Sequence, residues 1–374
     1  KAAKTIIDEG PYKLYSTKTP DKDYMMLFAQ ENASTEEYIL AIRNSYEAQV
    51  YHNATAYTLL PTQGRPGYTR KFINMYLKKD GTAFTDQEGW QTLPFTEAVK
   101  DRDPRLAQSI RTPGYKRIGA KRVQGPDLGV TITGYQPIKF VQDTTASGGQ
   151  IDRNDRSTCD MPVFRYAEVL LNYAESAWEL GRFDQGVADK TINKLRDRSG
   201  VAHMTVADIT SDFDPNRDKG NAPWWTGNGG KFGNYEVDPV LWEIRRERQI
   251  ELFGEGFAFY DVRRWAKAAY YVNRQPCGMW IKAQDNPYGT KNSAYSGSFV
   301  DYDEIQRTGK ATGEQNSVGS GWIYTYPSPL TDGGWIDTYY LMMVPTKQIV
   351  LNPQLTQNPG YNELFGLSDS GGAK

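Results

Sequence analysis

The sequence predicts a mostly α-helical fold built of tetratricopeptide-like helical repeats, with a loop-rich lobe of mixed structure attached to them. Three observations lead to this prediction. Residues 163–198 carry the periodicity of two consecutive helices, and residues 239–265 carry that of a second pair. The segments between and after these pairs are long and rich in Gly, Pro and aromatic residues.

The first helical pair has the clearer pattern. Its first helix is expected after Pro162 and ends at Gly181, and its second runs from about residue 184 to 198, where Ser199-Gly200 stops it. Small residues and a short turn are typical of the antiparallel helices of a tetratricopeptide repeat, although any helical hairpin shares this pattern. The residues on one face of the first helix are Phe164, Ala167, Leu170, Leu171, Ala174 and Trp178.

The second pair, from Trp242 to Trp265, concentrates charges and aromatic residues. Asp238 and Pro239 form a helix start, and Gly254 marks the stop. Acidic and basic residues recur at spacings of three and four, where side chains meet across one helical turn. The stretch therefore predicts a semi-buried ion network and a structural role. The pairs expected to meet are Glu243 with Arg246 and Arg248 with Glu251.

Shorter elements are predicted from local signals along the rest of the chain. They are a helix over residues 1–10 that Gly10-Pro11 ends, a helix at Tyr24–Gln30, a strand or buried extended run at Tyr38–Ile42, a helix at Thr69–Lys78, and strand candidates at Val130–Thr133, Ile138–Val141 and Tyr339–Pro345. Residues 44–68, 79–100 and 201–237 are expected to be loops.

Composition narrows the classes of function. The net charge of −1 gives none of the basic character of a nucleic-acid-binding protein. No run of about 18 apolar residues is present, so no transmembrane helix is expected. Cys159 and Cys277 could form a disulfide or remain thiols, and their spacing fits no metal motif. The chain starts at Lys1-Ala2-Ala3-Lys4 in mid-helix, which suggests a fragment of a longer polypeptide.

The motifs of common enzymes are not found. The sequence lacks a nucleophile elbow, a phosphate-binding loop, a His-Glu-x-x-His zinc motif and a dinucleotide-binding fingerprint. Its only histidines are His52 and His203. With 45 acidic residues, an Asp/Glu pair suited to glycoside hydrolysis is an open alternative, because sequence does not give carboxylate separation.

One stretch resembles the start of a calcium loop. Asp212, Asp214, Asn216 and Asp218 alternate, but Arg217 replaces the glycine of the turn and the final glutamate is absent. The sequence therefore favours a solvated acidic turn. No cofactor is predicted, and calcium is the alternative.

Aromatic loop residues are the strongest functional signal, since 13% of residues are Phe, Trp or Tyr. A sugar ring stacks its C–H face on Trp or Tyr, and its hydroxyls bond to nearby polar groups. Trp224-Trp225 and Trp90 are each flanked by polar side chains that could complete such a site. The alternative is that these rings fill the core.

Five motifs in order resemble the SusD/RagB family. They are Pro61-Thr62-Gln63-Gly64, Arg102-Asp103-Pro104-Arg105-Leu106, the stretch from Arg165 to Glu175, the stretch from Ile244 to Trp265, and the stretch from Asn352-Pro353 to Tyr361. The resemblance is weakest in residues 112–158 and 268–337.

The resemblance implies a non-enzymatic surface lipoprotein of the outer membrane of Bacteroidota. Such proteins are SusD-like α/α superhelices that cap a SusC-like TonB-dependent transporter and deliver glycans to it. The lipid anchor and the first repeats would precede this chain. A single domain is expected, with the end of a repeat at 1–30, a variable lobe at 31–160, a repeat core at 161–267 with an inserted loop at 201–237, and variable loops and a closing segment at 268–374.

The predicted function is glycan capture by stacking and polar contacts. The expected ligand-binding residues are Trp90, Tyr57, Trp224 and Trp225, followed by Trp280 and Trp322. A peptide-binding, RagB-like lid of the same class of transporter is the first alternative. A glycoside hydrolase and a plain repeat scaffold for protein partners are the others.

Overall fold

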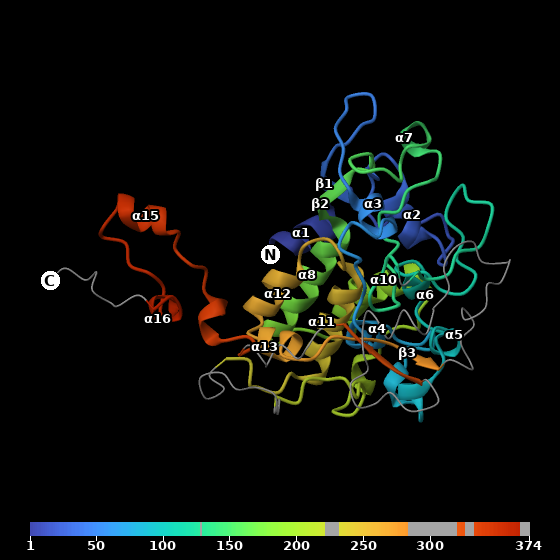
Figure 1. The fold of residues 1–374 in the computed structure, drawn as a ribbon. Helices are drawn as coiled ribbons and strands as arrows, with labels where there is room; N and C mark the ends of the chain where they lie inside the picture. Colours follow the sequence, from blue (N-terminus) through green and yellow to red (C-terminus); the bar gives the residue numbers. More distant parts are fainter. Residues whose placement is uncertain (128, 221–231, 283–319, 326–332, 367–374) are drawn as a thin grey trace. The chain divides into compact units, whose positions relative to one another are not determined.

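The computed structural model describes residues 1–127, 129–220, 232–282, 320–325 and 333–366 (Figure 1). The chain divides into two compact units, and helices dominate both, as predicted. The first unit comprises Lys1–Arg217, Asp238–Phe257 and Pro276–Tyr326, and the second comprises Asp218–Val237, Ala258–Gln275 and Pro327–Lys374.

The first unit contains a helical layer centred on α8, which packs against α1, α10 and α11 (Figure 1). Residues of α8 at helical spacing bury one apolar face together with Leu195 of α10 and with Leu252. This confirms the helix predicted after Pro162, although its start lies at Tyr166. The bounds of the layer are α1 (Ala2–Glu9), α8 (Tyr166–Glu179), α9 (Gln185–Lys190), α10 (Ile192–Ser199) and α11 (Pro239–Glu251).

The helix predicted over residues 184–198 is two helices. Asp184 caps α9 by accepting a hydrogen bond from the Val187 amide. Thr191, with φ −127° and ψ −88°, breaks the helical backbone before α10. Gly200 then ends α10 with φ 70°, a conformation that favours glycine. The predicted end is therefore confirmed, whereas the break has no marker in the sequence.

The start of α11 follows its local sequence closely. The Asp238 carboxylate accepts hydrogen bonds from the amides of Val240 and Leu241, and Pro239 occupies the first turn. The predicted pair between Glu243 and Arg246 forms at 2.5 Å. Nearly every residue of α11 is buried, including the charged ones. This helix therefore does not have a solvated face, and its charges need partners inside the protein.

A buried network of ion pairs supplies these partners. It contains as many cations as carboxylates, and no member exposes more than 3% of its side chain. The balance matters because an unpaired buried charge is strongly destabilising. The members are Lys139, Arg105, Arg165, Arg196, Arg198 and Arg246, and Glu37, Asp103, Glu243, Glu247, Glu251 and Glu255.

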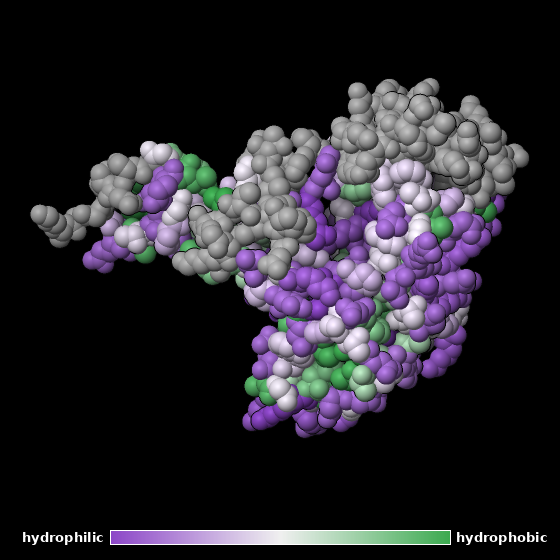
Figure 2. Space-filling view, turned by 90° about the horizontal axis from the view of Figure 1, so that it is seen from below, coloured by the Kyte–Doolittle hydropathy of each residue, from purple (hydrophilic) through white to green (hydrophobic). Residues whose placement is uncertain are grey.

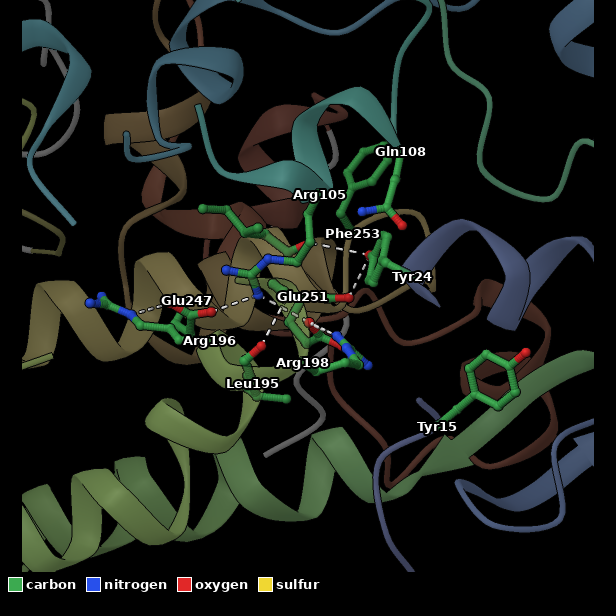
Figure 3. Close-up of polar contacts among 12 residues, drawn as sticks. Tyr15, Tyr24, Arg105, Gln108, Leu195, Arg196, Arg198, Glu247, Glu251 and Phe253 are labelled. Carbon is green, nitrogen blue, oxygen red and sulfur yellow. Dashed lines mark hydrogen bonds and ion pairs between the residues drawn. The ribbon is translucent and has the colours of Figure 1, made fainter. Parts of the chain in front are cut away.

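Glu251 lies at the centre of the network (Figure 3). Its carboxylate accepts hydrogen bonds from Arg198 at 2.6 Å, Arg165 at 2.8 Å and Arg105 at 3.1 Å. Burial alone would raise the pKa of Glu251, but these guanidinium groups outweigh burial and hold it well below its ordinary value. The semi-buried ion network expected in this stretch is thus fully buried.

A short antiparallel sheet joins distant parts of the first unit. β1 (Tyr38–Ile42), which matches its prediction, pairs with β2 (Met161–Arg165). The register is Tyr38 to Arg165 and Ile42 to Met161, with irregular pairing at Leu40. Arg165 at the end of β2 thereby reaches Glu37 at 2.6 Å. The sheet brings the lobe and the helical layer into contact with the ion network.

The lobe of the first unit consists of short turns of helix. The predicted helix at Thr69–Lys78 is confirmed only as α4, and the predicted loops contain α3 and α5. The strand candidates at 130–133 and 138–141 form no strand, because that segment pairs only through an isolated bridge at Pro137. The bounds are α2 (Asp23–Ala29), α3 (Ala54–Leu59), α4 (Arg70–Asn74), η1 (Phe84–Asp86), η2 (Trp90–Thr92), α5 (Phe95–Ala98), α6 (Pro104–Ala107), α7 (Ala146–Gly149) and η3 (Val206–Asp208).

A second antiparallel pair completes the first unit. β3 (Cys277–Lys282) pairs with β4 (Ser320–Tyr324), and Trp280 lies opposite Trp322. β3 packs beside α4 and α5 of the lobe. This hairpin was not predicted, because the two strands are separated by a long polar segment.

The second unit is smaller. Within it, the Lys267 ammonium pairs with Asp218 at 2.8 Å. The strand predicted at 339–345 is wrong: a 3-10 turn ends at Tyr340, and no strand partner follows in the described part of this unit. The bounds are α12 (Ala258–Arg264), α13 (Ala268–Val272), η7 (Asp337–Tyr340), α15 (Thr346–Leu351) and α16 (Tyr361–Leu364).

Where Figure 2 colours the surface by hydropathy, it is mostly hydrophilic, with apolar patches between the polar side chains. Among the helices of the described ranges, none has the length and apolar character that crossing a membrane requires.

Candidate functional site

Three of the six predicted ligand-binding residues meet in the first unit. Trp90 lies in η2, Trp280 in β3 and Trp322 in β4, and each ring is half-buried. The rings of Trp280 and Trp322 meet edge to face, with centroids 5.4 Å apart. We call Trp90, Trp280 and Trp322 the tryptophan platform. Three segments that are remote in sequence therefore present indole rings at one place.

Arg70 holds the platform together. Its guanidinium carbon lies 3.7 Å from the ring centre of Trp322 and 5.3 Å from that of Trp90. Its Nη2 donates hydrogen bonds of 2.8 Å to the carbonyl oxygens of Trp90 and Gln91. These contacts fix the backbone beside one indole and cover the face of another. Arg70 is thus the residue that links η2 to β4.

The charge of the Arg70 guanidinium is buried. Only 6% of the residue is exposed, and desolvation lowers its pKa, while the Tyr135 hydroxyl partly counteracts this. No carboxylate of the described ranges lies within ion-pair distance of its guanidinium. A guanidinium remains charged at neutral pH.

Local chemistry places these groups. The Thr69 hydroxyl caps α4 by accepting from the Phe72 amide, which fixes Arg70 at the first position of the helix. Gly89 adopts φ 72° and turns the chain into η2, where Trp90 follows. Gly278 lets β3 lie against the backbone of Thr133, since a Cβ there would clash with the Thr133 carbonyl. Close backbone approach therefore sets the position of Trp280.

A second arginine supports the platform through the ring of Phe84. Arg102 donates to the carbonyl oxygens of Ala98, Ile73 and Tyr76, and its guanidinium lies 3.8 Å from the ring centre of Phe84. The Phe84 ring in turn meets Trp90 edge to face at 6.3 Å.

The remaining predicted residues do not join this arrangement. Tyr57 lies on α3 with 48% of the residue exposed, and its ring lies beside Gly64. Trp224 and Trp225 fall outside the described residues. Sequence reasoning missed Arg70, because an arginine that stacks on a distant tryptophan has no local signature, and it named Arg102 only as part of a family motif.

The histidines and Cys159 are held by structural contacts. His52 Nε2 lies 2.8 Å from the Cys159 carbonyl oxygen, and burial lowers the pKa of His52. His203 is exposed and bonds to Asp197. Cys159 is a buried thiol that forms no disulfide with Cys277. Cys159 Sγ lies 3.5 Å from His52 Nε2, but burial raises the pKa of this thiol to about 12 and so disfavours the thiolate that a nucleophile requires.

The acidic turn does not gather its carboxylates around a cation. Asp214 accepts from the Trp242 indole at 2.7 Å and from the Asn216 amide at 2.8 Å. Asp218 pairs with Lys267. Across the described ranges, no group of three His, Cys, Asp or Glu side chains could hold a metal ion.

Comparison with known proteins identifies the family. The sequence profile of the SusD family matches residues 30–361. A SusD-like carbohydrate-binding protein from Bacteroides fragilis NCTC 9343 is similar in structure, with 22% identity and a TM-score of 0.58 over 95% of this chain and 60% of its own. A SusD-like protein from the same strain is 21% identical, with a TM-score of 0.58 over 96% of this chain and 62% of its own. No curated protein matches significantly.

At these identities the similarity concerns the fold alone. It agrees with the mostly helical architecture described above. The chain spans about three-fifths of the length of these two structures.

Proposed function

This chain belongs to the SusD family, and we propose that it is a non-catalytic protein that captures a glycan at the cell surface. The observation that carries the proposal is that Arg70 lies over the rings of Trp90 and Trp322, while Trp280 packs against Trp322. Half-buried indoles offer apolar faces on which sugar rings stack, and the rigid support beneath them limits the entropy lost on binding.

We further propose that the protein passes its ligand to a SusC-like TonB-dependent transporter of the outer membrane. It would be held there by a lipid anchor that precedes the present sequence. A structurally similar protein from B. fragilis is called carbohydrate-binding, which favours a glycan over a peptide as the ligand.

Affinity electrophoresis on a panel of polysaccharides, followed by calorimetry with the best ligand, tests this function. Trp322→Ala and Trp90→Ala should each weaken binding about tenfold, because each removes one stacking face and about 1.4 kcal/mol of binding free energy. Tyr57→Ala tests the remaining described candidate in the same series. Tyr260→Ala, which removes an exposed ring of the second unit, is the control and should leave affinity unchanged.

Three outcomes would contradict the proposal. Full affinity in both tryptophan variants would remove the platform from the site. A thermal shift with an oligopeptide pool and with no polysaccharide would favour the peptide-binding alternative. Release of reducing sugar by the purified protein would favour the hydrolase.

A further inference from the structure

The tryptophan platform rests on a buried positive charge that the described part of the protein does not neutralise. The guanidinium of Arg70 donates to two carbonyl oxygens and contacts two rings, and its Nε has no hydrogen-bond partner. Carbonyl and ring partners orient the cation without cancelling its unit charge. No carboxylate of the described ranges forms an ion pair with it.

Arg102 is a second buried cation, connected to Trp90 through the ring of Phe84. It is 3% exposed, and its contacts are three carbonyl oxygens and the Phe84 ring. The neighbouring Asp103 is bonded by Arg105 at 2.7 Å. Burial lowers the pKa of Arg102 to about 9, so this group is still a cation at neutral pH. The positive charge of Arg70 also lowers the pKa of Arg102, whereas Tyr135 and Asp103 counteract the lowering.

The contrast with the rest of the interior is informative. In the buried network around Glu251, cations and carboxylates are present in equal number. Near the platform the matching is weaker: Asp103 acts on Arg102 through its charge, and no carboxylate of the described ranges pairs with Arg70. Asp86 and Glu88, on the segment that leads to Trp90, are exposed, and water screens charges in that position. Within the described ranges, the charge of Arg70 therefore gives the platform a positive potential.

We infer that the glycan bound at the tryptophan platform is anionic, carrying uronate carboxylates or sulfate groups. This inference rests on the proposed function and adds the charge class of the ligand. A ligand that covers the indoles displaces water, so the field of Arg70 acts on it through a medium of low dielectric constant. A carboxylate or sulfate on the stacked sugar neutralises that field, whereas a neutral sugar leaves it unopposed.

The test begins with an array of neutral and acidic glycans, and the strongest ligand is then studied by calorimetry. We expect that ligand to be acidic. Its carboxyl-reduced or desulfated form should bind about five- to tenfold more weakly, the size of one charge interaction at this depth. High salt should reduce the difference between the two forms.

Arg70 is a positioning and specificity-determining residue, and two variants separate its charge from its packing. Arg70→Met should bring the affinity ratio of the acidic to the neutral form close to one. Arg70→Lys keeps the charge and should retain a preference for the acidic form. The ratio is measured on one protein sample, so partial loss of folded protein affects both forms equally.

Each outcome is decisive. A neutral glycan as the strongest ligand, or an unchanged ratio in Arg70→Met, would overturn the anionic assignment and leave the proposed function standing. If no glycan binds, both the assignment and the proposed function fail.

Discussion

Glu251 accepts hydrogen bonds from three buried arginines, so Glu251→Gln is a direct perturbation of the ion network. The amide keeps one acceptor oxygen but removes the negative charge, and Arg105, Arg165 and Arg198 are left with one carboxylate fewer between them. Removing one partner of a buried pair typically costs about 3–5 kcal/mol, because an uncompensated charge remains inside. We expect a loss of stability in this range.

Urea unfolding, followed by tryptophan fluorescence and circular dichroism, measures this loss. At a typical slope of about 3 kcal/mol/M, the midpoint should fall by about 1–2 M urea. Glu97→Gln is the matched control, since Glu97 pairs at 2.7 Å with Lys100 and both side chains are exposed. The control should cost less than about 1 kcal/mol. Equal losses in the two variants would refute the reasoning that burial makes this carboxylate indispensable.

Two further predictions concern protonation. Burial alone would raise the pKa of Glu247, Glu251 and Glu255, but their arginine partners hold it below the ordinary value of 4.5. The stabilisation that these three carboxylates contribute is therefore complete above about pH 4.5. It is lost as the pH falls toward their pKa values in the folded protein. Burial raises the pKa of Glu243, so the contribution of this group to stability changes with pH in the opposite sense. Urea titrations at successively lower pH should show a net loss of unfolding free energy. The loss should be smaller in Glu251→Gln, which lacks one of the three carboxylates. Burial also raises the pKa of Cys159 to about 12. In the Cys277→Ser variant, iodoacetamide at about pH 8 should therefore modify Cys159 about a thousandfold more slowly in the native protein than in the unfolded protein. Comparable rates would show that Cys159 is accessible in the native protein.

The sequence predicted best those elements whose cause is local. The cap at Asp238, the proline after it and the stop at Gly200 each depend on a few neighbouring residues. The strand at 38–42 was predicted, but not its partner at 161–165, because pairing is decided by contacts between distant segments. The strand candidates at 130–133 and 138–141 have residues that favour β-structure, but in the described structure no neighbouring strand pairs with them.

The candidate site shows the same division. Trp90, Trp280 and Trp322 could be proposed from residue type, since aromatic rings in polar loops favour binding. Their convergence could not be predicted, because it depends on the pairing of β3 with β4 and on the position of α4. Arg70 was missed for the same reason, as its role exists only once Trp322 lies across its guanidinium.

The ion network also constrains the order of folding events. Its members extend along the chain from Glu37 to Glu255. All of its ion pairs can therefore form only after most of the first unit has come together during folding. A partly assembled core would bury arginines without carboxylates, and such intermediates are high in free energy. Folding of this unit should therefore be slow and highly cooperative, with a transition state that depends on contacts between remote residues. Because the buried charges balance only when every member of the network is in place, the native state of this unit becomes stable only after the whole network has formed.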